Sequence, residues 1–168
     1  MNDSSKINIE TPQILHDFKV LTKLFEFRFN ILMKRSFDKL IQNSTKLSSF
    51  ENFNYSQVFY LQKATLAYGE LYVLGRFVDR IDVMEETETK NVLKELCVLY
   101  ALKSLEKDLD ILRECDYISS DFCYVIREEI TRLCDLLKDQ LIAIIDVIAP
   151  RDEILGAPLG YSDGRVIA

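Results

Sequence analysis

The sequence predicts an all-α fold, an antiparallel four-helix bundle followed by an irregular C-terminal tail that contains glycine and proline. Apolar residues recur at three- and four-residue steps through most of the chain, which is the periodicity of an amphipathic helix. Only five glycines and three prolines occur in 168 residues, too few turn signals for a fold of many short strands. Five of those eight residues lie between 150 and 168, where we expect the helices to end.

The length suits a single domain, which we place at residues 10–168 after a frayed or disordered N-terminus at 1–9. The first helix is expected to begin near Thr11 or Pro12, with Thr11 as its cap, and to end near Gln42.

Residues 43–54 are rich in serine and asparagine and show no apolar periodicity, so they predict a loop. We expect the two aromatic residues of this loop, Phe50 and Phe53, to pack onto the bundle.

The second helix is expected from about Tyr55 to Val83. Its predicted buried stripe consists of Val58, Leu61, Thr65, Tyr68, Tyr72, Phe77 and Ile81. Small residues on this helix would let a neighbouring helix approach closely, and they are Ala64, Ala67, Gly69 and Gly75.

A third helix should follow the acidic stretch 85–89, with Thr87 as its cap, and its apolar face continues to Leu112. A fourth should begin after residues 119–121 and stop at Pro150, because proline disfavours helical geometry in the residue before it.

The composition argues against several classes of partner. A net charge of −6 disfavours binding to nucleic acid or to anionic lipid, because both need a basic face. The longest apolar run, residues 141–145, is far shorter than the roughly 20 residues of a membrane span. The first ten residues contain no apolar segment of a signal peptide.

Catalytic and metal-binding patterns are weak, so we predict no catalytic residue and no metal site. The only histidine is His16, and Gln13 stands where a di-iron bundle would have the glutamate of Glu-x-x-His. No CxxC pair is present, and we expect free thiols, buried or half-buried in a reducing compartment, at Cys97, Cys115, Cys123 and Cys134.

Tyr68 and Tyr72 lie one helical turn apart, with Glu70 between them. Two interpretations stay open for these three residues. One is packing within the bundle, and the other is a polar pocket at a helix or subunit interface.

The tail carries stronger turn signals than a helical bundle needs. Asp146 stands in an apolar run, where a buried carboxylate would require partners. We expect it to hold the tail against the fourth helix by accepting hydrogen bonds from the tail backbone or Arg151, and the alternative is that it faces solvent.

Three segments of the tail resemble the end of the C-terminal domain of peroxisomal acyl-CoA oxidases. They are IDVI at 145–148, DEILGAPLG at 152–160 and SDGRVI at 162–167. Upstream, LFEFR at 24–28 and KATLA at 63–67 are similar to the family's helices in the same order, as is ELCVLYAL at 95–102. The resemblance marks a structural tail motif at Asp146, Asp152, Leu155, Gly156, Leu159, Gly160, Asp163 and Gly164.

The resemblance implies a role in peroxisomal fatty-acid β-oxidation. Members of that family are FAD-dependent oxidoreductases that oxidise acyl-CoA to trans-2-enoyl-CoA and reduce O2 to H2O2. The resemblance implies that the catalytic glutamate and most flavin contacts lie in upstream domains. We therefore expect this chain to be inactive alone, to bind no FAD alone and to serve a structural or dimerisation role. The alternative is a standalone helical module without catalysis that pairs with full-length oxidases.

The resemblance also implies partners and a location. The expected partners are a second copy or another acyl-CoA oxidase subunit, in a homodimer or heterodimer. The expected location is the peroxisome. The last three residues, 166–168, are not a peroxisomal targeting tripeptide, which would favour the cytoplasm for a standalone protein.

Overall fold

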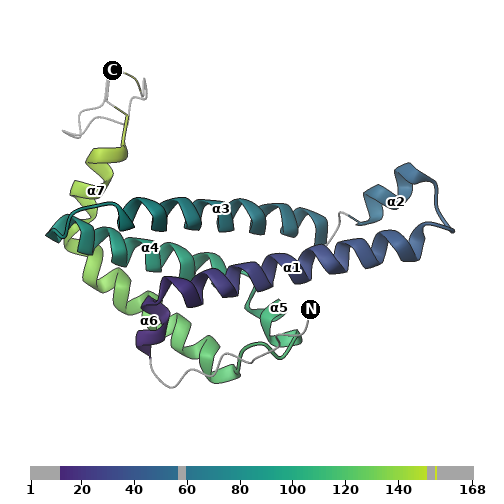
Figure 1. Cartoon of the computed structure of the whole chain (residues 1–168), viewed down its shortest axis with the longest axis horizontal. Coiled ribbons are helices and arrows are strands. Elements are labelled where there is room, and N and C mark those ends of the chain that lie inside the picture. Colours follow the sequence, from purple (N-terminus) through teal and green to yellow (C-terminus); the bar gives the residue numbers. More distant parts are fainter. Residues whose placement is uncertain (1–11, 57–59, 151–153, 155–168) are drawn as a thin grey trace, which may run out of the picture. The chain divides into compact units, whose positions relative to one another are not determined.

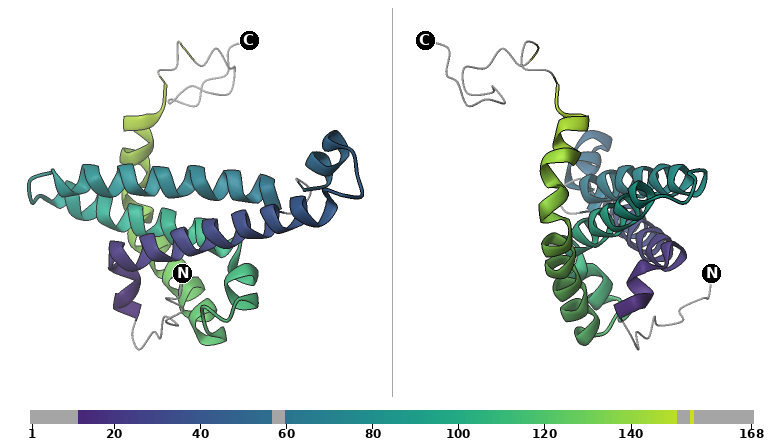
Figure 2. Two further views of the ribbon diagram at one scale, coloured as in Figure 1. Left: turned by 45° about the vertical axis from the view of Figure 1, so that its right-hand side comes forward. Right: turned by 90° about the vertical axis from the view of Figure 1, so that its left-hand side faces the viewer.

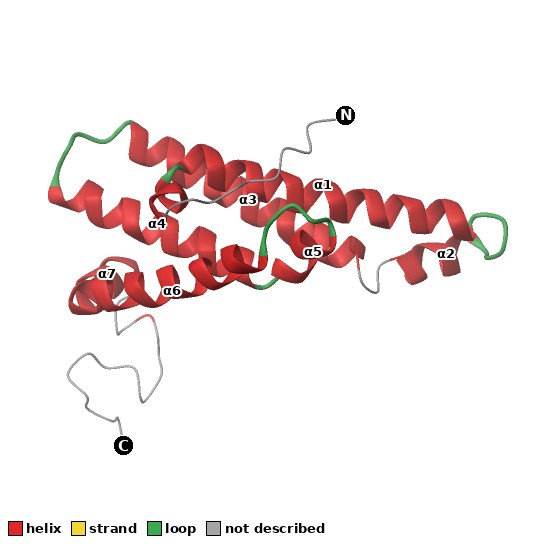
Figure 3. Cartoon of the chain, turned by 90° about the horizontal axis from the view of Figure 1, so that it is seen from below, coloured by secondary structure: helices red, strands yellow, loops and turns green. Residues whose placement is uncertain are grey.

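A computed structural model describes residues 12–56, 60–150 and 154, and every regular element in these ranges is helical (Figures 1 and 3). The predicted all-α class is confirmed. In chain order the elements are η1 (Pro12–His16), α1 (Phe18–Asn43), α2 (Ser49–Ser56), α3 (Gln62–Asp82), α4 (Glu88–Glu106), α5 (Leu109–Glu114), α6 (Ser120–Leu137), η3 (Lys138–Gln140) and α7 (Leu141–Ile148).

The chain divides into two compact units, residues 1–135 and 136–168, which are described separately. In the first unit, α1, α3 and α4 lie side by side, and each runs antiparallel to the next (Figures 1 and 2). The α6 helix crosses these three at an angle, so the first unit is not the expected bundle of four aligned helices (Figure 2).

The contact between α1 and α3 is the most extensive in the first unit. Ala64 and Ala67 of α3 are buried there beside Leu32 of α1, and Ile111 completes the cluster. Because alanine adds little thickness to a helix face, the two backbones can lie close together. The expected role of the small residues is therefore confirmed for the two alanines.

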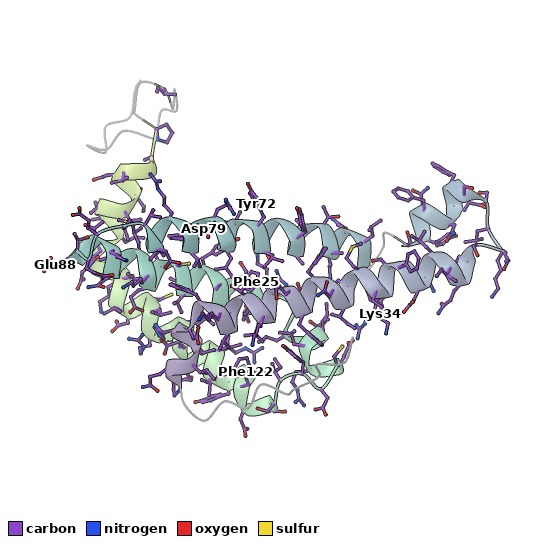
Figure 4. The ribbon with its side chains drawn as sticks, in the orientation of Figure 1. Phe25, Lys34, Tyr72, Asp79, Glu88 and Phe122 are labelled. Atoms are coloured by element: carbon purple, nitrogen blue, oxygen red, sulfur yellow. The ribbon has the colours of Figure 1, made fainter. Side chains whose placement is uncertain are left out.

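The main core joins all the long helices of the first unit. Figure 4 labels Phe25 of α1 and Phe122 of α6, and both side chains are buried in it. Burying a side chain of this size contributes about 1.5–3 kcal/mol. Other core members are Leu15, Leu21, Leu24, Leu74, Ile81, Cys97, Val98, Ala101, Leu102, Leu105, Leu109, Leu112, Ile118, Ile126 and Leu133.

The first long helix begins later than the sequence predicted. Asp17 has extended geometry (φ −83°, ψ 107°), and its carboxylate accepts a hydrogen bond of 2.8 Å from the backbone N–H of Lys19. An aspartate that caps in this way starts a new helix at the next residue. The expected start at Thr11 or Pro12 is wrong, since Pro12–His16 forms a separate 3-10 turn.

The predicted loop at 43–54 contains a helix, α2. Its start is a capping box, in which Ser48 and Glu51 bond each other's backbone and side chains at 2.7–3.3 Å. Phe50 is 76% exposed and Phe53 is 51% exposed. The expected packing of these rings on the bundle is therefore wrong.

The stripe predicted for the second helix is mostly wrong. The residues of α3 that are buried are Ala64, Ala67, Leu74 and Ile81. Of the predicted stripe only Ile81 is fully buried, while Thr65, Tyr68 and Tyr72 are exposed, and Val58 lies outside the described residues. The helix is also shorter than predicted, since α3 begins at Gln62.

The third predicted helix is confirmed at its start and wrong at its end. Thr87 accepts a hydrogen bond of 3.2 Å from the backbone N–H of Lys90, as an N-cap should. The helix breaks at Lys107 and Asp108, so the apolar face that continues to Leu112 is shared by α4 and α5.

The fourth predicted helix is divided into α6, η3 and α7. It ends before Pro150 as predicted, because Ala149 is extended (φ −63°, ψ 135°). In the second unit, α7 exposes the apolar side chains of Leu141, Ile142, Ile145 and Val147. None of the described helices is both long and apolar enough to cross a membrane.

Candidate functional site

The most unusual residue of the first unit is Arg28, which lies on α1 with no solvent exposure. Its Nη2 donates to Glu70 Oε2 at 2.6 Å, and its Nη1 donates to the carbonyl of Ser104 at 2.8 Å. Its guanidinium carbon lies 4.8 Å from the centre of the Phe25 ring. A buried cation is tolerated only when it is paired and hydrogen-bonded in this way.

The partners of Arg28 are themselves shared with lysines. Glu70 also accepts from Lys107 at 3.0 Å, and the hydroxyl of Tyr100 donates to the Glu70 carbonyl at 3.3 Å. Asp108 lies 3.6 Å from Arg28 and accepts from Lys63 at 2.9 Å.

The hydrogen bond that Lys63 donates to Asp108 raises the pKa of Lys63, although burial opposes this. The arginine, its carboxylates and the two lysines form an ion network that ties α1 to α3 and to the end of α4.

A groove of about 460 Å³ lies beside this network, between α3 and α4. Its walls are mostly apolar, and its rim holds two lysines, each more than 60% exposed. The residues that line it are Glu70, Phe77, Leu96, Leu99, Tyr100, Lys103, Ser104 and Lys107.

The structure separates Tyr68, Glu70 and Tyr72, for which packing and a shared interface pocket were the two open interpretations. Glu70 belongs to the ion network and lines the groove, but neither Tyr68 nor Tyr72 does. The Tyr68 ring is 56% exposed and lies 5.6 Å from the Phe29 ring. Tyr72 is 59% exposed and points outward, with Arg76 5.6 Å from its ring (Figure 4).

A second polar cluster surrounds His16 of η1. Its Nε2 lies 2.8 Å from Glu129 Oε1, and its Nδ1 lies 3.6 Å from Glu95 Oε2. Arg132 donates to Glu129 at 2.7 and 3.0 Å. Burial by itself raises the pKa of Glu129, but the bonds from Arg132 and His16 outweigh it, and the net pKa is lowered.

These carboxylates and the histidine line or flank a second cavity of about 440 Å³ that also includes Pro12 and Gln13. Arg132 forms an ion pair with Glu129, and His16 is hydrogen-bonded to the same carboxylate, which makes Glu129 a structural partner in this arrangement. Across the described part of the chain, no three histidine, cysteine or acidic side chains are placed to hold a metal ion together.

The tail motif lies almost wholly outside the described residues. Asp146 is described, and its side chain is exposed on α7, which agrees with the alternative that it faces solvent. The other positions fall beyond the described part, and they are Asp152, Leu155, Gly156, Leu159, Gly160, Asp163 and Gly164.

The comparisons with known proteins agree on one family. A family model described as acyl-CoA oxidase matches residues 17–167. Peroxisomal acyl-coenzyme A oxidase 3 of Homo sapiens is 33% identical over 153 residues, which are 89% of this chain and 22% of the human protein. Acyl-coenzyme A oxidase acox-3 of Caenorhabditis elegans is 29% identical over 147 residues, 87% of this chain and 22% of the worm protein.

Solved structures show the same fold. Acyl-CoA oxidase 3 of Yarrowia lipolytica superposes with a TM-score of 0.73 at 25% identity, covering 90% of this chain and 22% of that one. Arabidopsis thaliana acyl-CoA oxidase 1 superposes with a TM-score of 0.79 at 20% identity, covering 96% and 24%. The chain thus spans about a fifth of the length of these relatives. It belongs to the acyl-CoA oxidase family.

Proposed function

We propose that this chain is the C-terminal helical domain of an acyl-CoA oxidase-like flavoprotein and that its role is structural. The family reaction converts acyl-CoA and O2 to trans-2-enoyl-CoA and H2O2. The observation that carries the proposal is the family match over residues 17–167, combined with an ion network in which Arg28 and two lysines pair with the carboxylates of Glu70 and Asp108. A buried network of paired charges fixes how the helices of a scaffold lie against one another.

The groove between α3 and α4 does not suit a flavin dinucleotide. A diphosphate is held best at a helix N-terminus, where backbone N–H groups point at the anion. The groove is walled by the side of α3 and by the C-terminal half of α4, and it contains the carboxylate of Glu70. We therefore propose that FAD is held by the rest of the oxidase and not by this chain alone.

A role in assembly is supported by the apolar surface that the first unit exposes. Large apolar side chains left in water favour association with a protein partner. We propose that this partner is acyl-CoA oxidase polypeptide, within one subunit or across a homodimer or heterodimer, in the peroxisome. The exposed side chains are Met33, Phe37, Ile41, Phe50, Phe53, Tyr55, Leu66, Tyr68, Tyr72 and Val73.

We assign a structural role to the tail motif as well, including Asp146. Its carboxylate is exposed on α7, so it is free to accept hydrogen bonds from residues that follow. Under this proposal Asp146→Asn changes the protease sensitivity of the tail and leaves catalysis by an assembled oxidase untouched.

The proposal is tested by reconstitution with human acyl-CoA oxidase 3 from which the segment matched by this chain has been removed. Peroxide is measured with acyl-CoA, FAD and O2. We expect no turnover by this chain alone and a gain of turnover when it is added to the truncated human protein. Turnover by this chain alone, or no gain on mixing, would overturn the proposal.

A further inference from the structure

We propose that the groove between α3 and α4 receives an acidic amphipathic helix from the remaining part of an acyl-CoA oxidase subunit. The inference rests on the proposed function and names the surface and the chemistry by which this domain docks. Four features support it: the apolar floor, the surplus of cations on the rim, the open shape, and the length of the relatives.

The floor of the groove is apolar and continues onto the outer face of α3. Phe77, Leu96 and Leu99 line the groove. Gly69 and Val73 precede Phe77 at four-residue spacing, so these three positions follow one ridge of the helix. Val73 is 47% exposed, and a side chain added at Gly69 would meet nothing within 4 Å.

Gly69 is informative because no atom of the described residues occupies the space that its missing side chain leaves. Glycine inside an exposed helix costs about 1 kcal/mol relative to alanine. In the first unit that cost is not offset by close packing at Gly69, unlike the packing at Ala64 and Ala67. A helix lying across the ridge would use the open space to approach the backbone of α3.

The rim carries more positive than negative charge among the pairs that the structure shows. Lys107 shares Glu70 with Arg28, and Lys103 shares Glu106 with Arg127 at 3.3 and 3.7 Å.

Asp108 also forms an ion pair with Arg28, but the same carboxylate is bound by Lys63. Each carboxylate therefore meets two cations, and the lysines of the rim can accept a further anion in a chain whose net charge is −6.

The shape favours a helix over a small ligand. Small-molecule pockets enclose most of their ligand, whereas Lys103 and Lys107 are 63% and 62% exposed and leave the groove open. Antiparallel helices α3 and α4 form its two sides, and an amphipathic helix can lay an i, i+3, i+4, i+7 apolar face between them. Carboxylates beside that apolar face would reach the two lysines.

The length of the relatives indicates where the docking helix comes from. It spans 22% of the human relative, so most of an oxidase subunit lies outside it and is available as the neighbour of this surface. An apolar groove of this kind is covered when the domain is part of the whole protein.

The test measures binding of this full chain to human acyl-CoA oxidase 3 that lacks its matched segment, by isothermal titration. Replacing both rim lysines, Lys103→Glu with Lys107→Glu, should weaken binding at least tenfold. The matched control is Lys34→Glu with Lys39→Glu, the same charge change at exposed positions of α1, and it should bind like the wild type.

Gly69→Leu tests the same surface with a variant whose new side chain has room, so we expect the chain to fold normally. A Cβ at this position meets nothing within 4 Å among the described residues, and leucine favours a helix, so the melting temperature should stay or rise. We expect binding to fall at least tenfold, because the side chain fills the space for the docking helix.

The outcomes separate this inference from the proposed function. If the wild type binds and the rim and Gly69 variants bind equally well, the groove is not the docking surface, and the proposed function stands. If the control variant loses as much affinity as the rim variant, general charge attraction explains binding and the inference is overturned. If the wild type neither binds nor restores turnover, the proposed function fails and the inference fails with it.

Discussion

Arg28 of α1 donates a hydrogen bond of 2.6 Å to Glu70 of α3, and the guanidinium has no contact with water. The carboxylate is 21% exposed and is also bound by Lys107. The pair therefore joins a buried cation to a carboxylate near the surface. The pair spans the contact between α1 and α3, the most extensive helix contact of the first unit. It therefore fixes the alignment of α1 along α3 and pairs the buried charge of Arg28 with a carboxylate.

Removing the side chain of Arg28 should strongly lower the free energy of unfolding of the first unit. Arg28→Ala leaves Glu70, Asp108 and the Ser104 carbonyl without their common donor, and we expect a loss of about 3–5 kcal/mol, the scale for breaking a buried ion pair. Urea denaturation followed by circular dichroism measures it. Arg76→Ala is the control, because that arginine is 67% exposed and its pair with Asp79 should contribute less than about 1 kcal/mol.

A double-mutant cycle separates the pair from its surroundings. Glu70→Gln keeps the shape and a hydrogen-bond acceptor but removes the charge that faces Arg28. If the two side chains stabilise the fold together, the combined variant should lose less than the sum of the single losses. Additive losses would show that Arg28 acts through its other contacts, with Asp108, the Ser104 carbonyl and the Phe25 ring, and not through Glu70.

The second prediction concerns acid stability and Glu129. Its pKa is lowered in the folded chain, because bonds from Arg132 and His16 outweigh the effect of burial. A lowered folded pKa adds stability that is present above the unfolded pKa, about 4.3 for glutamate, and is lost as the pH falls through the folded pKa. The free energy of unfolding should therefore fall on acidification in this range.

Glu129→Gln should flatten that part of the pH profile, measured by urea denaturation at a series of pH values from about 6 to about 3. Glu128→Gln is the matched control, since Glu128 is the exposed neighbour on the same helix. Equal flattening by both variants would mean that the pairing of Glu129 does not contribute to the acid sensitivity.

The sequence allows the helices to be predicted where the signal is local. Thr87 followed by Glu88 specifies a helix start, and Pro150 after an apolar run specifies a helix end, both through backbone chemistry alone. The start of α2 carries the same kind of signal, Ser48 with Glu51 three residues later, but its polar composition made it resemble a loop.

The buried faces depend on which helix lies opposite, and one sequence does not contain that information. On α3 the aromatic positions and the alanine positions lie at helical spacing, and the structure buries the alanines against α1. The burial of Arg28 could have been predicted from the sequence, because this residue stands in an apolar stripe at helical spacing. The stripe consists of Leu21, Leu24, Phe25 and Leu32. Its partners could not be predicted, since Ser104 and Glu70 are 76 and 42 positions away.

The third prediction compares two threonines whose hydroxyls make different hydrogen bonds, one that caps a helix and one within a helix. Thr87 caps α4 by accepting from the Lys90 N–H, and Thr87→Ala should cost about 1 kcal/mol because that N–H loses its partner. Thr131 is exposed within α6, where its hydroxyl donates to the Arg127 carbonyl that already serves the helix. Thr131→Ala should change the free energy of unfolding by less than about 0.5 kcal/mol. Equal losses would contradict the capping role.

The last prediction separates the cysteines by their reactivity. Burial raises the pKa of Cys97 to about 12, and this thiol has no solvent exposure, whereas Cys134 is exposed. Because the thiolate is the reactive form, iodoacetamide at about pH 8 should modify Cys134 first and should reach Cys97 only after denaturation. Burial also raises the pKa of the half-buried Cys123, which places its reactivity between the other two.

Mass spectrometry of the alkylated chain at successive times measures this order, and Cys134→Ser should remove the first modification and leave the others unchanged. In urea all the thiols should react at similar rates, since burial no longer distinguishes them. Modification of Cys97 in the native chain as fast as Cys134 would mean that the core around α4 opens readily. The tight packing of Cys97 among Val98, Ala101 and the core of α1 argues against such opening, because exposing this thiol requires α4 to separate from its neighbours.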